Sequence, residues 1–172
     1  RVLGTTLETV PGEVPYLVSN GFCNGFNGWV VGGATAENDE DGNGGRVGIV
    51  WGGSPTHKSD RNRSCKVTDF LPILQVPGIR FYSLQVGVRE ALRMQHRAAD
   101  LKQLPPEITV EDLSPHIKNY SDTAAIVSQL DLIISVDTSV AHLAGALAKP
   151  VWTLLCYNPD WRWMLEREDT PW

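Results

Sequence analysis

From position 46 onward, short runs of apolar residues alternate with segments that have helical spacing. The runs predict strands over 47–51, 80–84, 108–110, 132–136 and 151–155, and the segments predict helices over 68–74, 90–104, 121–130 and 138–148. The strands are apolar on both faces, which is typical of a parallel sheet covered by helices on both sides. The pattern therefore predicts an α/β fold, a Rossmann-like, doubly wound parallel sheet of about five strands.

The first 45 residues follow a different pattern. Residues 19–45 are rich in Gly, Asn and acidic side chains, and they contain no apolar period long enough for a helix. Turn-forming residues at this density predict a flexible linker. The acidic run from Glu37 to Asp41 does not have the spacing of a Ca²⁺-binding loop. We therefore expect the folded domain to begin at residue 46 and to extend to 172.

Composition narrows the class of protein. The 172 residues, 42% of them hydrophobic, are enough for the core of one domain of roughly 100–200 residues. The net charge is −5 and no cluster of Lys and Arg stands out, which argues against nucleic acid as a partner. No apolar run approaches the ~18 residues of a transmembrane helix. The three cysteines have no paired spacing, so we expect no metal site and a cytoplasmic protein.

Candidate chemistry follows the fourth predicted strand. Asp137 and Thr138 stand where that strand gives way to a helix, and either side chain could cap the helix. The amides of Thr138, Ser139 and Val140 would point outward at the positive end of the helix dipole, an arrangement that binds phosphate or pyrophosphate. His142, one turn into the helix, could face the same ligand. The alternative is an ordinary capped helix with a hydrogen-bonded histidine.

The loop after the first predicted strand, residues 52–64, is long for a strand-to-helix connection, and long loops are often functional. It does not have the GxxxxGK[ST] order of a Walker loop, and a solvated basic loop is the alternative interpretation. Gln85, just after the second strand, could read the edge of a base or a ribose, or it could be a surface residue. The donors for an anionic ligand in the loop are Ser54, Thr56, Lys58, Arg61 and Arg63.

Five segments carry recognisable motifs: 47–58, 61–64, 81–85, 131–146 with the downstream Pro150, and 159–163. Together they resemble the carboxyl-terminal domain of family 9 glycosyltransferases, the heptosyltransferase family, and above all its bacterial members that follow tetratricopeptide repeats. The resemblance covers residues 46–172, and residues 1–18 resemble the end of the amino-terminal half-domain. It implies one half of a GT-B architecture, in which the active site lies between two Rossmann-like domains.

The resemblance also implies what the domain binds. Its ligand would be a nucleotide-diphosphate sugar, the donor of an inverting, metal-independent transfer to an acceptor hydroxyl, with no cofactor. By similarity, the amides of Thr138, Ser139 and Val140 would hold the diphosphate. Asp137 would contact the donor sugar. Ser139 stands where heptosyltransferases usually have Gly, so its hydroxymethyl group is expected to crowd the phosphate.

The resemblance assigns the remaining polar residues to the same ligand. Arg63 matches the basic position that neutralises the departing nucleotide diphosphate, while Ser54 and Thr56 would line the phosphates. Gln85 matches a polar position near the nucleoside. In the family the catalytic base is an Asp of the amino-terminal half-domain, so we assign no catalytic residue here. We expect the donor-binding domain to be inactive alone, as a fragment.

Two other functions remain open at this stage. One is a non-catalytic interaction module, a transferase-derived scaffold in which exposed Trp161, Trp163 and Trp172 form a protein interface. The other is a nucleotide-binding domain of a reductase, which suffers from the lack of GxGxxG after the first strand. For the transferase, the expected partners are the amino-terminal half-domain and tetratricopeptide repeats, in the cytoplasm or at the periphery of the inner membrane.

Overall fold

The computed structural model of the chain describes residues 44–54, 56–58, 60–86 and 97–163. The predicted half-domain remnant 1–18, most of the predicted linker 19–45 and the first part of the predicted helix 90–104 lie outside them. The five strands are β1 Arg46–Val50, β2 Arg80–Ser83, β3 Val110–Asp112, β4 Leu132–Val136 and β5 Val151–Leu154. The α-helices are α1 Asp60–Arg63, α2 Leu71–Leu74, α3 Tyr120–Val127 and α4 Ser139–Ala146. The described 3₁₀ helices are η1 Val67–Phe70, η2 Arg97–Gln103, η3 Ser114–His116 and η4 Trp161–Trp163.

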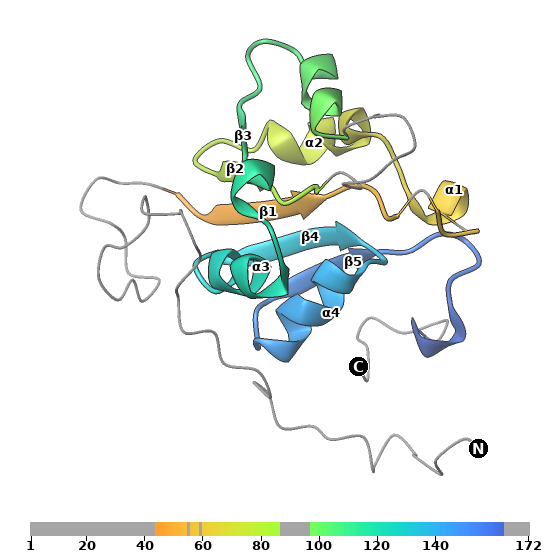
Figure 1. Ribbon diagram of the computed structural model, residues 1–172. Helices are drawn as coiled ribbons and strands as arrows, with labels where there is room; N and C mark the ends of the chain where they lie inside the picture. The colour runs from red at the N-terminus through yellow and green to blue at the C-terminus, as the bar shows by residue number, and fades with distance from the viewer. Residues whose placement is uncertain (1–43, 55, 59, 87–96, 164–172) are drawn as a thin grey trace, which may run out of the picture.

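The strands form one sheet in the order β3-β2-β1-β4-β5, and every pair in it is parallel. In the central register Gly48 of β1 lies opposite Tyr82 on one side and Ile133 on the other. The first strand, β1, lies in the middle of the sheet. The chain continues outward through β2 to the edge strand β3 and then crosses to β4 on the other side of β1, so the direction of winding reverses between β1 and β4 (Figure 1). Ligands of such sheets bind beyond the carboxyl ends of the strands at this reversal.

Helices cover both faces of the sheet. The helices α3 and α4 lie on one face, and η1 and α2 lie on the other (Figure 1). Consecutive residues of β4 show the alternation, because Ile133 packs into the first core and Ile134 into the second. Both are essentially inaccessible to solvent. The predicted fold class, a Rossmann-like parallel sheet covered on both faces, is therefore confirmed.

Local boundaries differ from the prediction in places. The third strand begins two residues later than predicted, at Val110. The helix expected over 121–130 begins at Tyr120, because the side chain of Asn119 accepts a hydrogen bond from the amide of Asp122 at 3.0 Å and caps the helix. Among the described residues, no helix has the length and apolar character needed to cross a membrane.

Helix α4 ends earlier than predicted, at Ala146. The amide of Lys149 donates to the carbonyl of Ala144 at 2.9 Å, and the amide of Ala148 donates to the carbonyl of Gly145 at 2.9 Å. This pair of bonds is a Schellman ending, and it holds Ala148 at a φ of 56°. The left-handed conformation suits Gly better than Ala, so the ending is strained at one residue.

Candidate functional site

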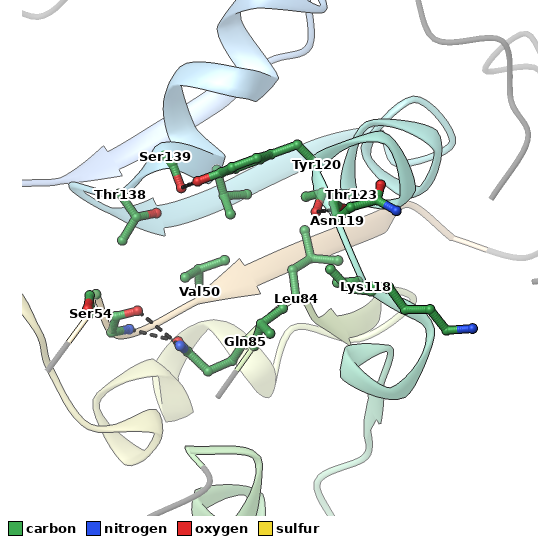
Figure 2. Close-up of a pocket in the computed structure, with 15 residues that line it drawn as sticks. Val50, Ser54, Leu84, Gln85, Lys118, Asn119, Tyr120, Thr123, Thr138 and Ser139 are labelled. Atoms are coloured by element: carbon green, nitrogen blue, oxygen red, sulfur yellow. Dashed lines mark hydrogen bonds between the residues drawn. The ribbon is translucent and has the colours of Figure 1, made fainter. Parts of the chain in front are cut away.

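A cavity of about 370 Å³ opens where the sheet reverses its winding. Its walls come from the ends of β1 and β2, from the segment that leads into α3, and from the start of α4 (Figure 2). Ser54, Gln85, Thr138, Ser139 and Val140, all predicted site residues, line it. The structure thus gathers five of the predicted residues around one cavity, at the edge of the sheet where ligands of this fold bind.

The start of α4 leaves backbone donors without a side-chain cap. Thr138 is the N-cap residue, with extended backbone, but its side chain makes no capping hydrogen bond. Its hydroxyl pairs instead with Ser135 Oγ at 3.0 Å. Ser139 and Val140 occupy the first two helical positions and line the cavity. Their amides have no acceptor within the helix, so they offer an anion two donors and the positive end of the helix dipole.

Gln85 fixes the opposite wall. Its Oε1 accepts a hydrogen bond from the amide of Trp51 at 3.1 Å. The same oxygen accepts from the amide of Gly52 at 2.9 Å, and Gln85 Nε2 donates to the Gly52 carbonyl at 3.0 Å (Figure 2). The residue is only 3% exposed, so the alternative of an ordinary surface residue is wrong. The side chain joins the end of β2 to the loop after β1, and its amide is engaged with backbone.

Asp137 links two further predicted residues. The guanidinium of Arg63 donates from Nη1 to the Asp137 carbonyl at 3.1 Å, and His142 Nε2 lies 3.8 Å from Asp137 Oδ1. None of these three residues is among those that line the 370 Å³ cavity. Arg63 lines a separate cavity of about 290 Å³, bounded also by Phe70 and Leu154. The two groups of predicted residues are therefore neighbours, connected through the backbone at Asp137 and Thr138.

The loop after β1 is held by hydrogen bonds. The Gly53 amide donates to Ser64 Oγ at 3.0 Å, which donates in turn to Asp60 Oδ1 at 2.9 Å. A Cβ on Gly53 would lie 2.6 Å from side-chain atoms of both Arg63 and Asp60, so a larger residue here would displace these two side chains. The loop also contains a short helix, α1, that the sequence pattern did not predict.

The outer part of the same loop is exposed. Ser54 lines the cavity, and its hydroxyl lies 2.8 Å from that of Thr56. Thr56 and Lys58 are both exposed, and neither is among the described residues that line the cavity. Their predicted contact with phosphates stays a prediction, as do the ligand roles of the other predicted residues.

Trp163 is not the exposed aromatic residue that the interaction-module interpretation required. Its ring stacks on His142, with ring centroids 5.4 Å apart and planes inclined by 20°. It is 6% exposed. Trp161 is 76% exposed, as expected, and Trp172 lies outside the described residues.

Sequence reasoning missed one side of the cavity. Lys118, Asn119, Tyr120 and Thr123 line it from the segment that follows β3 and from α3. The hydroxyl of Tyr120 donates to Ser139 Oγ at 3.1 Å, whereas the side chain of Lys118 extends away from Tyr120 (Figure 2). The rule that ligand residues follow strand ends would have found this segment, had it been applied to the short third strand.

The cavity combines apolar and polar lining residues. Most of its polar side chains stand at or next to the two helix starts, and Ser54 and Gln85 lie on the opposite wall; the apolar lining residues are Val50, Leu84, Val86, Ile117 and Val140. Such a combination, an apolar recess with a few convergent donors, is typical of a small-molecule site. Within the described residues, no three His, Cys, Asp or Glu side chains come together in a way that could hold a metal ion.

Comparisons with known proteins show which proteins this chain is similar to. The family model described as glycosyltransferase family 9 (heptosyltransferase) matches residues 92–165. Protein FlbA of Caulobacter vibrioides is 28% identical over 122 residues, which cover 69% of this chain and 19% of FlbA. A solved structure of E. coli heptosyltransferase WaaC with ADP-2-deoxy-2-fluoro heptose aligns with a TM-score of 0.49 and 20% identity, over 72% of this chain and 36% of that one.

The chain thus spans 19% of the length of FlbA and 36% of the WaaC chain. The family match contains α3, β4, α4 and β5, and with them the Tyr120 and Ser139 side of the cavity. The segment after β1 and Gln85 lie before it. The resemblance of residues 46–91 and the tetratricopeptide-repeat context therefore stay predictions, whereas the resemblance to the family is confirmed for residues 92–165, which match glycosyltransferase family 9, the heptosyltransferase family.

Proposed function

We propose that residues 46–172 form the donor-binding domain of a glycosyltransferase, and that the 370 Å³ cavity receives the nucleoside diphosphate of a nucleotide sugar. The observation that carries the proposal is the start of α4: two backbone donors without a side-chain cap, Ser139 and Val140, line a cavity at the reversal of the sheet. This helix belongs to the segment that matches a sugar-transfer family. A helix start of this kind suits a diphosphate.

The cavity has a polar part at the start of α4 and an apolar part at the end of β1 and beside it. The diphosphate would lie at the amides of Ser139 and Val140, and the nucleoside would extend along the apolar wall formed by Val50 and Leu84. That wall can exclude water from a base, whereas the helix start supplies the charge complement. Gln85 would contribute by fixing the wall, because its amide is engaged with the backbone of the loop after β1.

The chemistry that follows is an inverting transfer without a metal. The acceptor oxygen attacks the anomeric carbon, the bond from that carbon to the diphosphate oxygen breaks, and the diphosphate leaves with the electron pair. Donors at the start of α4 would stabilise this developing charge, and the guanidinium of Arg63, bonded to the Asp137 carbonyl, adds a positive charge nearby. The acceptor proton requires a base, which we expect from the amino-terminal half-domain of the GT-B enzyme.

Calorimetric titration with ADP, UDP and GDP tests the proposal. We expect wild-type protein to bind at least one of them. Ser139→Pro removes one amide donor, yet proline fits the first helical position, and the preceding Thr138 has the extended backbone that proline tolerates. The matched control is Ser139→Ala, which keeps the amide. Relative to this control, Ser139→Pro should weaken binding about 10-fold, the usual effect of losing one hydrogen bond to a charged group.

The interaction module stays as a second candidate, because large apolar side chains remain exposed after α4. Trp152 is 59% exposed and Trp161 is 76% exposed. Wild-type protein that binds none of the three nucleotides would overturn the donor-binding proposal and favour this candidate. Binding that Ser139→Pro and Ser139→Ala weaken equally would contradict the assignment of the diphosphate to the start of α4.

A further inference from the structure

Tyr120 and Ser139 form a contact across the opening of the cavity, which we call the clasp. Tyr120 is the first residue of α3, and Ser139 is the first residue of α4. The Tyr120 hydroxyl donates to Ser139 Oγ at 3.1 Å, so a single hydrogen bond joins the two helix starts (Figure 2). Both residues line the cavity, and Tyr120 is 64% exposed. The contact is therefore accessible to a ligand that enters.

The direction of the hydrogen bond leaves a second donor. A serine hydroxyl carries one hydrogen and can accept at its oxygen at the same time. Because Ser139 Oγ accepts from Tyr120, the hydrogen of Ser139 is available for another acceptor. A hydroxyl that already accepts a hydrogen bond is polarised and becomes a better donor. Ser139 also contributes its amide at the same helix start, so both donors can reach one anion.

We propose that the Ser139 hydroxyl is a third phosphate donor, beside the amides of Ser139 and Val140, and that Tyr120 is a positioning residue that orients it. The proposal rests on the proposed function, because the anion is the diphosphate of the nucleotide sugar. It also differs from the expectation for Ser139, whose hydroxymethyl group, at a position where the family usually has glycine, was expected to crowd the phosphate. The clasp turns the hydroxymethyl group toward α3, so that the group binds the phosphate instead of crowding it.

A double-mutant cycle on the affinity for the nucleoside diphosphate that binds tightest tests the clasp. Ser139→Ala should weaken binding about 10-fold, because a hydrogen bond to a charged ligand is lost. Tyr120→Phe keeps the ring and removes the hydroxyl, and it should weaken binding about 3-fold. In the Ser139→Ala background, Tyr120→Phe should have no further effect, because the hydroxyl it orients is already absent.

Two further variants separate positioning from a general structural role. Ser139→Thr keeps the hydroxyl and should restore most of the affinity that Ser139→Ala loses. Tyr157→Phe removes the hydroxyl of a fully exposed tyrosine that is not among the described cavity residues, and it should leave affinity unchanged. Thermal unfolding of each variant confirms that the domain is folded, since both clasp residues are at the surface.

Each outcome bears on the clasp. Additive losses in the cycle, an unchanged affinity of Ser139→Ala, or a failure of Ser139→Thr to restore binding would overturn it while the donor-binding function stands. Wild-type protein that binds no nucleoside diphosphate would overturn both. Non-additive losses with rescue by threonine, and with the Tyr157→Phe control unchanged, would support the positioning role of Tyr120.

Discussion

Replacing Gln85 with leucine tests how the wall of the cavity is built. The Gln85 side chain forms three hydrogen bonds, all with the backbone of Trp51 and Gly52, at distances of 2.9 to 3.1 Å. Leucine has a similar volume and can occupy the same space, so the packing changes little. A leucine side chain has no hydrogen-bonding group, so the amides of Trp51 and Gly52 and the Gly52 carbonyl would lose their side-chain partner. Gln85→Leu therefore isolates these hydrogen bonds.

The magnitude follows from the burial of those groups. Trp51 is 0% exposed and Gln85 is 3% exposed, so the groups left behind are poorly hydrated. An unpaired buried backbone group costs about 1–3 kcal/mol. Water in the adjacent cavity can reach part of the wall, so we take the low end for each of the three groups. The expected loss in the free energy of unfolding is about 3 kcal/mol, a large fraction of the roughly 5–15 kcal/mol that stabilises a typical domain.

Equilibrium unfolding in urea, followed by tryptophan fluorescence, measures this loss. The matched control is Gln103→Leu, since the Gln103 side chain makes one exposed hydrogen bond, to Asp100 Oδ1 at 3.1 Å. That control should change stability by less than about 0.5 kcal/mol. If Gln85→Leu were no more destabilising than Gln103→Leu, the reasoning that Gln85 holds the end of β1 would be refuted.

Three other substitutions test separate features of the fold. Ala148→Gly should raise the free energy of unfolding by about 1 kcal/mol, because a residue at a φ of 56° is relieved of strain; an unchanged urea midpoint would contradict this. Gly48→Ala should lower the free energy of unfolding by about 1–3 kcal/mol, which unfolding in urea measures. The reason is steric, because a Cβ at this position would lie 2.8 Å from Leu130 Cδ1 and 2.9 Å from Ile133 Cδ1. Burial raises the pKa of Tyr82 above 10.0, so the stability of wild-type protein should fall relative to Tyr82→Phe as the pH rises past that value; parallel pH profiles would contradict it.

Much of the fold could be predicted from the sequence because its strands are buried on both faces. The run 132–136 is apolar except for the buried Ser135, and Ile133 and Ile134 pack into opposite cores. The start of α4 could also be predicted, because the apolar strand ends at Val136 and the helix-capping types Asp137 and Thr138 come directly before an Ala-rich helix. These features depend on local sequence and on burial, which leave a periodic pattern.

The rest depends on contacts between segments that are distant in the chain. Gln85 bonds to residues more than 30 positions away, and Tyr120 bonds to Ser139 across the cavity. Neither bond has a periodic pattern in the sequence, because one polar side chain in a loop can pair with many partners. The third strand, three residues long, is too short for its apolar pattern to fix its start, so the segment after it was missed.

The most direct measurement of the central claim is the response of the backbone amides to a nucleoside diphosphate. In ¹H–¹⁵N spectra of the wild-type protein, titration with the tightest-binding nucleotide should shift the amides of Ser139 and Val140 most, together with other residues that line the 370 Å³ cavity. Shifts confined to residues around the 290 Å³ cavity, such as Cys65 and Leu155, or the absence of any shift at saturating nucleotide, would contradict the account.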